Sequence, residues 1–392
     1  MNGTAVALCA VGAEKTVSNE LRKLGFSISE GGFGRVRFKA DLGGLYRALM
    51  GLRAADRVLL ETAWFEAADF DALFEGVRSV PWEDYVPPRL GLRVAKVRTN
   101  RSKLSAETSI QAVVHKAAAE RLCTKRGINR LPGGSGSAAH GDEAELRVYI
   151  EKDRVSVLLD LSGEPLFKRG YRTRGGTAPL RETTAAAIIL YSGWRRKFSL
   201  YDPFCGAGTI AIEAALYAWD IAPGLGRTFA LEQLLFGDRD TERKVREEFL
   251  GKVDFSRAVR ITGSDSDQAA VAAAKANMER AFALAAGSAE VEGNRPLGLP
   301  GFRVLSMEEA EPPEEAGFII TNPPYGRRLG DAESAERTYT EMGKLAGHFA
   351  GWKLAVITDH PGYESFFGRK ADSCREITNG AIRSYLFQYE KL

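Results

Sequence analysis

The chain has 392 residues, of which 44% are hydrophobic and 27% are charged, and its net charge is +3. This composition is typical of soluble globular proteins, and the length predicts two or three domains. No run of about 18 apolar residues occurs, and the first residues lack the basic flank and apolar core of a signal peptide. We therefore expect neither a transmembrane helix nor secretion.

The four cysteines lie far apart in the chain, and none belongs to a CxxC pair. This spacing argues against a zinc site and against a disulfide framework. It fits the reducing environment of the cytoplasm, where we expect the protein to act without a bound metal. The cysteines are Cys9, Cys123, Cys205 and Cys374.

Basic residues gather in three clusters in the first half of the chain, and acidic residues are scarce inside them. A run of charge is often only a solvated surface, but three such clusters favour a face that binds an anion such as RNA or DNA. The clusters are Arg93, Lys96, Arg98, Arg101 and Lys103; Arg121, Lys125, Arg126 and Arg130; and Lys168, Arg169, Arg172 and Arg174.

Short strand patterns and one long helical pattern make up the first half, which we interpret as a mixed α+β region. Residues 130–144, RLPGGSGSAAHGDEA, predict a loop inside a domain. Residues 164–179, EPLFKRGYRTRGGTAP, mix glycines, prolines and basic residues and predict a linker. The expected strands are residues 5–10, 35–38, 57–63, 93–97, 145–150 and 155–161, and the expected helix is residues 105–126.

After the linker, strand patterns alternate with helical patterns, which predicts βαβ units and a mostly parallel sheet. Near the end, Asn379-Gly380 separates two strand-like runs and predicts an antiparallel hairpin. A plain dinucleotide-binding domain does not end in this way. The expected strands are residues 197–201, 302–305, 318–320, 353–359 and one that begins at 259, and the expected helices include 181–191, 210–219 and the stretch after GSDSD.

The segment YDPFCGAGTI, residues 201–210, carries a strand that ends at Asp202, a Gly-x-Gly turn and the start of a helix near Thr209. Gly206 and Gly208 let the backbone approach a ligand, and the helix start offers free amides. The third glycine of the nicotinamide fingerprint and the P-loop lysine are both absent, which argues against NAD and ATP. Asp202 suits the positively charged methionyl end of S-adenosylmethionine. A simple strand-to-helix turn is the alternative.

An acidic residue follows the second strand of this half, in ITGSDSD. Asp265 lies where a doubly wound sheet places the carboxylate that holds ribose hydroxyls. Asp267 or Ser266 is then expected to cap the next helix. The separation from Asp202 is longer than the usual ~20 residues, so residues 220–256 are interpreted as an insertion.

The fourth strand of this half ends in TNPPYGRRLGD, residues 321–331. The Asn322 carboxamide and the Pro323 carbonyl would accept the N–H groups of an exocyclic amine on a nucleobase. Pro323 and Pro324 restrict the backbone, so these acceptors are held in place before substrate arrives. Tyr325 offers a face on which an extruded base can stack. A turn that merely ends a strand is the alternative interpretation.

DPFCGAGT, GSDSD and NPPYGRRLGD, in this order, resemble the motifs of class I S-adenosylmethionine-dependent amino-methyltransferases. With KRGYRTRGGTAPLRET (168–183) and IAPGLGR (221–227), the pattern is similar to THUMP-domain RNA methyltransferases related to the bacterial 23S rRNA guanine-N2 enzyme. The specific motifs cover residues 165–392, and over residues 1–164 the resemblance is topological.

The resemblance implies an α/β fold: a Rossmann-like class I methyltransferase domain, with a seven-stranded sheet and an antiparallel terminal hairpin, after an α+β ferredoxin-like and THUMP region that binds RNA. The implied divisions are residues 1–55 (ferredoxin-like), 56–164 (THUMP), 165–180 (linker) and 181–392 (methyltransferase). It implies that S-adenosylmethionine is held by Asp202, Phe204, Gly206, Gly208, Thr209 and Asp265, and the base by Asn322, Pro323, Pro324 and Tyr325.

One position departs from the pattern of the family. Relatives usually have an acidic residue after the third strand, in contact with the adenine of the cofactor. Here the stretch reads Leu305-Ser306-Met307-Glu308, so we expect Ser306 or a backbone amide to serve, unless Glu308 takes the position.

The sequence thus predicts an RNA methyltransferase that forms N2-methylguanosine, with structured RNA, in particular 23S rRNA, as its partner and no membrane. The alternatives are guanine-N2 methylation of tRNA, N6-methylation of adenine, and a non-catalytic RNA-binding factor. The residues expected to contact RNA are Arg98, Arg101, Lys103, Lys125, Arg126, Lys168, Arg169, Arg327 and Arg328.

Overall fold

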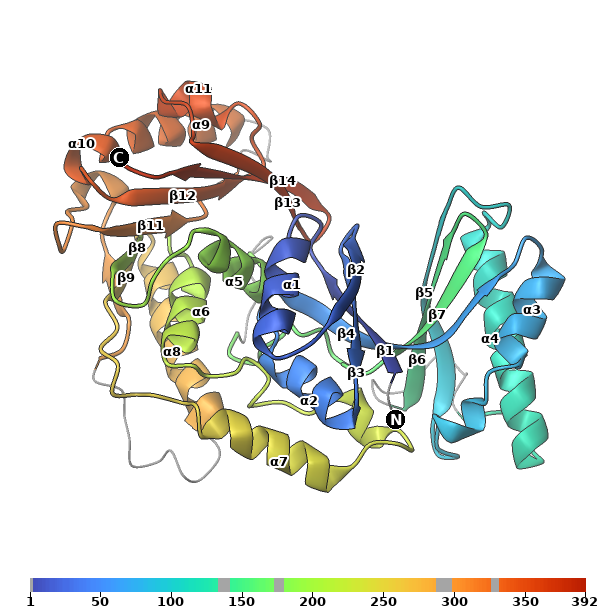
Figure 1. Ribbon diagram of the computed structural model, residues 1–392. Coiled ribbons are helices and arrows are strands. Elements are labelled where there is room, and N and C mark those ends of the chain that lie inside the picture. Colours follow the sequence, from blue (N-terminus) through green and yellow to red (C-terminus); the bar gives the residue numbers. More distant parts are fainter. Residues whose placement is uncertain (1–2, 133–141, 173–179, 287–297, 326–330) are drawn as a thin grey trace.

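A computed structural model describes residues 3–132, 142–172, 180–286, 298–325 and 331–392. Its strands form two seven-stranded sheets, one from each half of the chain (Figure 1). The N-terminal sheet has the order β2-β3-β1-β4-β7-β6-β5, and the C-terminal sheet has the order β10-β9-β8-β11-β12-β14-β13. The fold class predicted from the sequence is confirmed.

In the N-terminal sheet one long strand, β4, pairs with a strand on each side and so joins two groups of strands. The first part of β4 (Ala55–Glu66) pairs with β1 (Gly3–Cys9), and its second part pairs with β7 (Arg154–Asp160). The sheet therefore continues from the expected ferredoxin-like segment into the expected THUMP segment, and the division after residue 55 stays a prediction. The other elements are α1 (Glu14–Lys23), β2 (Ile28–Gly32), β3 (Arg35–Ala40), α2 (Leu42–Gly51), α3 (Phe70–Arg78), the 3₁₀ helix η1 (Trp82–Asp84), β5 (Gly91–Asn100), α4 (Glu107–Arg126) and β6 (Glu143–Glu151).

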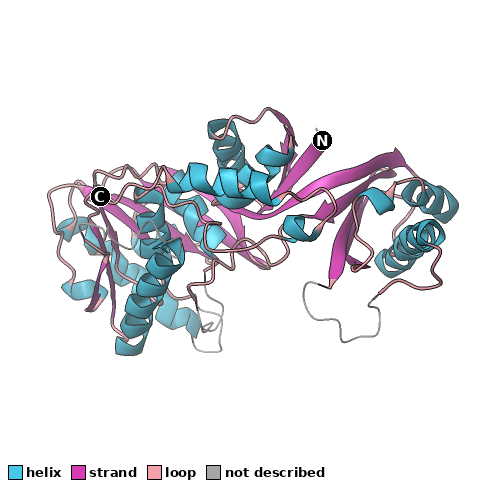
Figure 2. Ribbon diagram, turned by 90° about the horizontal axis from the view of Figure 1, so that it is seen from below, coloured by secondary structure: helices cyan, strands magenta, loops and turns pink. Residues whose placement is uncertain are grey.

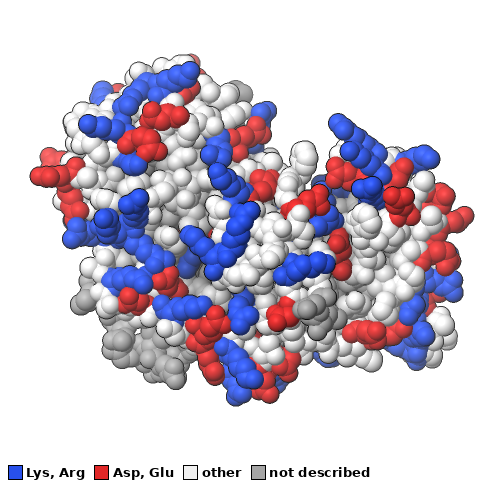
Figure 3. All heavy atoms as spheres, viewed as in Figure 1, with Lys and Arg blue, Asp and Glu red and all other residues white. Residues whose placement is uncertain are grey.

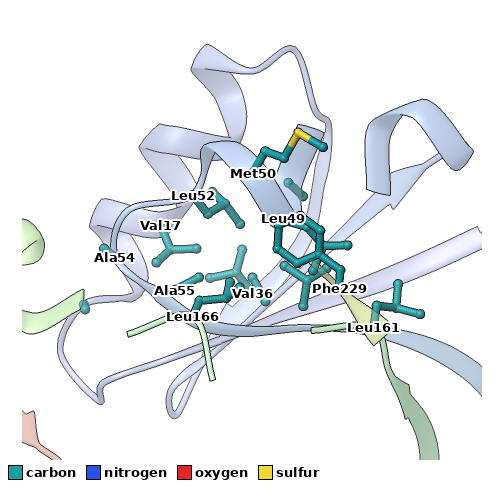
Figure 4. Packing of buried hydrophobic residues seen from close by; sticks show 14 of the residues in the cluster. Val17, Val36, Leu49, Met50, Leu52, Ala54, Ala55, Leu161, Leu166 and Phe229 are labelled. Carbon is teal, nitrogen blue, oxygen red and sulfur yellow. The ribbon is translucent and has the colours of Figure 1, made fainter. Parts of the chain in front are cut away.

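Alternating side chains give the N-terminal sheet a buried face. Val36 and Phe38 on β3, for example, are fully buried while their neighbours are not. Figure 4 shows that this core also holds Leu166, from the expected linker, and Phe229, from the expected insertion. The two halves of the molecule therefore share one hydrophobic core, and residues 164–172 are packed rather than a free tether.

The C-terminal sheet is built around β8 (Ser199–Asp202), whose four residues are all buried. Parallel pairing joins β10 (Gly301–Val304), β9 (Ile261–Asp265), β8, β11 (Gly317–Thr321) and β12 (Lys353–Thr358). Their carboxyl ends consequently meet at one edge. The strands β13 (Ser373–Asn379) and β14 (Ile382–Tyr389) then form the predicted antiparallel hairpin.

Helices accompany this sheet and the insertion. The segment 220–256 carries two of them and packs on the N-terminal half, where the Gly224 amide donates to the Met50 carbonyl at 2.9 Å and Arg47 pairs with Glu248 at 2.9 Å. Figure 2 shows the N-terminal sheet extending from the middle of the molecule to its far end, where α3 and α4 lie outermost. The helices are α5 (Glu182–Tyr191), α6 (Thr209–Ala218), η2 (Ala230–Gln233), α7 (Arg239–Leu250), α8 (Gln268–Ala286), η3 (Met307–Glu309), α9 (Asp331–Gly343), α10 (Leu345–His348) and α11 (Tyr363–Phe367).

No helix in the described ranges has the length and apolar character needed to cross a membrane. The four cysteines are free thiols. Within the same ranges, no group of three or more His, Cys, Asp or Glu side chains is arranged to hold a metal ion.

Candidate active site

The last residues of β8 and β11 are joined by a buried hydrogen bond. The Thr321 hydroxyl donates to Asp202 Oδ1 at 2.6 Å, and the Phe204 amide donates to the same oxygen at 3.2 Å. Asp202 is 1% exposed. This burial, together with the charge of Asp265, raises the pKa of Asp202 to about 7, although both hydrogen bonds oppose the shift. The site thus contains a carboxyl group that a cationic ligand would keep ionised.

The glycine-rich turn after β8 adopts a backbone that favours glycine. Gly206 and Gly208 have φ values of 51° and 84°. A Cβ at Gly208 would lie 3.0 Å from the Ala274 side chain of α8, whereas a Cβ at Gly206 would meet no atom within 4 Å. Gly208 therefore fits the turn against α8, and Gly206 faces open space in which a ligand can approach the backbone.

Asp265 lies directly beside this opening. Its Oδ2 accepts the Gly206 amide at 2.9 Å and its Oδ1 accepts the Asp267 amide at 3.0 Å. A carboxylate has about four lone-pair sites, so both oxygens can also accept ribose hydroxyls. Asp267 accepts the Ala269 amide at 2.8 Å, which is the capping contact expected from the sequence.

The loop after β10 lies next to the same carboxylate, because the Leu305 amide donates to the Asp265 carbonyl at 3.1 Å. Ser306 is occupied in a local cap, in which its hydroxyl lies 3.1 Å from Glu309 Oε2. The hydroxyl is therefore already engaged as a donor, while its oxygen can still accept a hydrogen bond. The role of Ser306 toward the cofactor stays a prediction.

Two more of the expected cofactor residues lie near the turn, and one of them contacts the segment before α5. Thr209 begins α6, and its Oγ1 accepts Arg172 Nη2 at 2.5 Å. Phe204 is half-buried and packs beside the aromatic cluster under β8 and β12. The structure thus brings Asp202, Phe204, Gly206, Gly208, Thr209 and Asp265 together at one edge of the sheet.

The Asn-Pro-Pro-Tyr corner follows Thr321 without a gap, so the hydrogen bond to Asp202 ties it to the glycine-rich turn. Asn322 Oδ1 accepts the Tyr325 hydroxyl at 2.6 Å, and the Pro324 carbonyl accepts the Tyr339 hydroxyl at 3.2 Å. Asn322 is half-buried and Pro324 is exposed, so the corner opens to the surface. In this conformation Tyr325 acts as a partner of Asn322 as well as an aromatic face.

Tyr339 and Thr358 support the corner and were not anticipated from the sequence. Their hydroxyls lie 2.8 Å apart, and Tyr339 also holds the Pro324 carbonyl. Thr358 ends β12 at the same edge, so the rule that ligand sites lie at the carboxyl ends of parallel strands would have pointed to it. Tyr339 belongs to α9, and no pattern in the sequence connects that helix to Pro324.

The basic residues expected at an RNA-binding surface differ in their surroundings. Arg98, Arg101, Lys103, Lys125 and Lys168 are exposed, although Arg98 pairs with Glu107 at 2.8 Å. Arg126 is half-buried and donates to the Val86 carbonyl at 2.6 Å. Arg327 and Arg328 lie outside the described residues. Figure 3 shows basic side chains gathered at the upper tip of the lobe formed by β5, β6 and β7.

Arg169 corrects one expectation. It is 6% exposed, donates to the carbonyls of Arg53 at 2.5 Å and Leu166 at 2.7 Å, and lies 3.5 Å from Glu213. Its guanidinium is therefore enclosed between the two halves of the molecule and is not presented to RNA. A buried arginine of this kind offsets a buried carboxylate.

The parallel sheet, the antiparallel hairpin and the paired carboxylates beside an open glycine turn define an S-adenosylmethionine-dependent methyltransferase. Residues 169–387 match the RMKL-like methyltransferase domain, and residues 4–59 match the RlmL ferredoxin-like domain. The chain belongs to this RlmL-like methyltransferase family.

Known proteins resemble the chain over nearly its whole length. YpsC of Bacillus subtilis, an RNA methyltransferase by name, is 34% identical over 98% of this chain and 95% of its own length. The ribosomal RNA large subunit methyltransferase K/L of Cellvibrio japonicus is 34% identical over 98% of this chain, but over only 50% of its own length. The chain therefore spans about half of the K/L proteins.

Two solved structures share the fold. SMU.472, a methyltransferase by name and crystallised with SAH, has a TM-score of 0.85 and 34% identity and covers all of this chain and 98% of its own. A Listeria monocytogenes protein, named as an N6-adenine-specific DNA methylase, has a TM-score of 0.86 and 35% identity over 99% of this chain and 96% of its own.

Proposed function

We propose that this protein methylates the exocyclic N2 of guanine in RNA, with 23S rRNA as the substrate. The observation that carries the proposal is the link between Asp202 and Thr321, which places the Asn322 corner beside the glycine-rich turn. A bound S-adenosylmethionine would supply an electrophilic methyl group at this edge. The names of YpsC and of the K/L proteins support RNA, and those of the K/L proteins support ribosomal RNA of the large subunit.

The residues of the corner suit a substrate in which an exocyclic amine accepts the methyl group. The Asn322 carboxamide oxygen and the Pro323 carbonyl would accept the two N–H groups of the guanine amine, which leaves the nitrogen lone pair directed at the methyl group. The nitrogen–carbon bond forms as the sulfur–carbon bond breaks, and the methylated nitrogen then releases one proton to water. Fixed acceptors of this kind lower a barrier because they need no rearrangement during the reaction.

We expect Tyr325 to move when a base enters. Its hydroxyl now donates to Asn322 Oδ1, and its departure leaves room for the base amine to donate there instead. The exchange conserves one hydrogen bond at Oδ1 and frees the Tyr325 ring to lie against the base. The Pro324 carbonyl is already held by Tyr339, which keeps the corner in place during the exchange.

N6-methylation of adenine is the second candidate, because adenine N6 is also an exocyclic amine and the Listeria structure carries that name. Nucleoside analysis after incubation of the purified protein with S-adenosylmethionine and unmodified 23S rRNA or tRNA separates these possibilities. We expect N2-methylguanosine in 23S rRNA. N6-methyladenosine alone would overturn the guanine assignment, and N2-methylguanosine confined to tRNA would overturn the ribosomal one. A protein that binds neither S-adenosylmethionine nor SAH would be a non-catalytic factor.

A further inference from the structure

A groove of about 400 Å³ lies on the N-terminal sheet, away from the methyltransferase edge. It is bounded by the turn between β2 and β3 and by the turn between β6 and β7. Its floor includes Val6, Tyr149 and Leu158, from three different strands of the sheet. The groove is therefore formed by the sheet itself and by two turns that project beyond it.

Two large aromatic side chains in this groove are exposed. Phe33, in the β2–β3 turn, is 82% exposed, and Trp64, on β4, is 54% exposed. Phe33 also has a φ of 49°, a left-handed conformation that a bulky residue rarely adopts. Folding does not explain a strained and exposed aromatic residue, because the ring is not buried and glycine would suit the backbone better. Strained residues of this kind cluster at binding sites.

Arginines lie over aromatic rings along the same groove. Arg35 lies 4.8 Å from the centre of the Tyr149 ring, and Arg154 lies 5.7 Å from that of Trp64. Both arginines also pair with carboxylates, Arg35 with Glu151 at 3.6 Å and Arg154 with Glu66 at 3.7 Å. These carboxylates are 45% and 75% exposed, so the pairs are weak and a phosphate can compete for the guanidinium groups.

The charge of the lining favours an anion. Four cationic side chains, Arg35, Arg37, Lys152 and Arg154, and two carboxylates, Glu30 and Glu151, line the groove. Arg37 is held by Glu30 at 2.7 Å and by Glu61 at 2.9 Å, so Arg35, Lys152 and Arg154 are the cations that remain for an anion. The Lys103 amide donates to Asp153 Oδ1 at 2.8 Å, which attaches the exposed Arg101 and Lys103 to the β6–β7 turn. The basic cluster found in the sequence thus continues the charge of the groove.

Contacts through Val11 link the turn that carries Phe33 to the terminal hairpin of the methyltransferase sheet. Thr358, at the carboxyl end of β12, pairs with Tyr385 of β14, so the turn between β13 and β14 projects from that edge. Beside this turn, the Thr378 amide donates to the Val11 carbonyl at 3.0 Å. A Cβ at Gly34 would lie 3.5 Å from the Val11 side chain, which brings the hairpin next to the turn that carries Phe33.

We propose that this groove binds unpaired nucleotides of the RNA substrate, with bases stacked on Phe33 and Trp64 and phosphates held by Arg35, Lys152 and Arg154. Exposed aromatic faces with adjacent cations suit single strands, because bases in a duplex are already stacked on one another. The inference rests on the proposed RNA substrate and adds where an unpaired segment is held. It does not depend on which atom of the base is methylated.

Tryptophan fluorescence provides a direct signal for binding of an oligonucleotide in the groove. Of the five tryptophans, Trp82, Trp194, Trp219 and Trp352 are at most 4% exposed, so Trp64 is the one that a solvent-side ligand can reach. We expect a short oligoadenylate, too short to fold, to quench the tryptophan emission of the full chain. The Trp64→Phe variant should bind the oligonucleotide but lose the quenching. A blunt-ended RNA duplex without unpaired nucleotides should quench little.

Variants of Phe33 test the stacking itself. Phe33→Gly removes the ring and relieves the positive φ, so it should fold at least as stably as the wild-type protein. For this variant, fluorescence anisotropy with labelled oligoadenylate should give a Kd about tenfold higher than for the wild-type protein. The reason is that stacking of one base on an aromatic side chain contributes about tenfold to the affinity. Phe33→Tyr should restore binding. Phe70→Ala is the matched control, since Phe70 is 40% exposed on α3 and does not line the groove.

Three outcomes would overturn the inference: unchanged Trp64 emission, unchanged affinity in Phe33→Gly, or equal affinity for the duplex and the single strand. The proposed function fails separately. If the Phe33→Gly variant methylates RNA normally, the protein has the catalytic activity but not this binding site. A protein whose Trp64 is quenched by single strands, but which methylates no RNA, has the binding site without the activity.

Discussion

The Thr321 hydroxyl donates a hydrogen bond to Asp202 at 2.6 Å across two neighbouring strands. Asp202 begins the glycine-rich turn and Thr321 precedes Asn322, so a single buried contact fixes the cofactor turn relative to the amine-accepting corner. Methyl transfer requires donor and acceptor atoms to approach in line, and a small displacement between them is costly. The contact therefore explains how two loops from different strands keep one geometry.

The Asn322 carboxamide is predicted to act on the rate and not on cofactor binding. Asn322→Ala should leave the Kd for S-adenosylmethionine nearly unchanged and lower single-turnover methylation by roughly 10²-fold or more, as for other lost preorganised contacts. Calorimetry and single-turnover kinetics measure the two quantities. Asn129→Ala, at an exposed position after α4, serves as the control. An equal loss of both quantities would make Asn322 structural.

The hydroxyl and the ring of Tyr325 are predicted to have separable effects. Tyr325→Phe removes the donor that occupies Asn322 Oδ1 but keeps the face for stacking, so the rate constant for methylation should stay within about threefold. Tyr325→Ala should raise the KM for RNA by about tenfold or more, because stacking on a base is lost. Steady-state kinetics of the two variants distinguish these effects. Equal defects in both would assign the role to the hydroxyl.

The raised pKa of Asp202, about 7, predicts that cofactor binding depends on pH. A cationic ligand favours the carboxylate, so binding should release a proton and the affinity for S-adenosylmethionine should increase as the pH rises through about 7 and then level off. Calorimetry across this range measures the affinity. Asp202→Asn should flatten the profile, whereas Asp71→Asn, at an exposed position on α3, should retain it. A wild-type profile without this rise would contradict the assignment.

The same shift has a consequence for stability without cofactor. The carboxyl group of Asp202 has a pKa of about 3.9 in the unfolded chain, lower than in the folded protein. Its contribution to the free energy of unfolding is therefore fully present below about pH 4 and is lost as the pH rises through about 7. Urea unfolding should show that Asp202→Asn removes this part of the pH dependence. If the difference in the free energy of unfolding between wild type and Asp202→Asn is the same below about pH 4 and above about pH 7, the prediction is refuted.

Arg169 is predicted to stabilise the fold through Glu213, which has a side chain that is 0% exposed. Arg169→Ala should lower the free energy of unfolding by about 3 kcal/mol or more, because a buried carboxylate loses its cation. Lys168→Ala changes the adjacent, exposed lysine and should alter the stability by less than about 0.5 kcal/mol. Urea titrations compare the two. Similar, small losses in both would restore a surface role for Arg169.

The sequence predicted those strands in which the local pattern of apolar and turn residues agrees with the pairing to adjacent strands. The strands around DPFCGAGT and NPPY are short apolar runs that end in turn residues, and both lie where expected. β2 (Ile28–Gly32) was not anticipated, since its two glycines disfavour a strand and its pairing with β3 decides its conformation. β4 is longer than the expected strand because it pairs with β1 and then with β7.

The site could be predicted as far as its residues are adjacent in the chain. Gly206, Gly208 and Asn322 belong to motifs whose spacing reflects local backbone geometry. The contacts of Arg169 with Glu213 and of Tyr339 with Pro324 join distant segments, so composition and spacing carry no signal for them. A basic residue in a cluster looks the same in sequence whether it faces RNA or a buried carboxylate.

A crystal structure of the protein with S-adenosylhomocysteine tests the central claim most directly. The account predicts that the ribose contacts Asp265, that the methionyl end lies toward Asp202, and that the thioether sulfur faces the Asn322 corner. A sulfur atom directed away from Asn322, or a corner closed off from the cofactor, would contradict the proposed transfer to an amine held there.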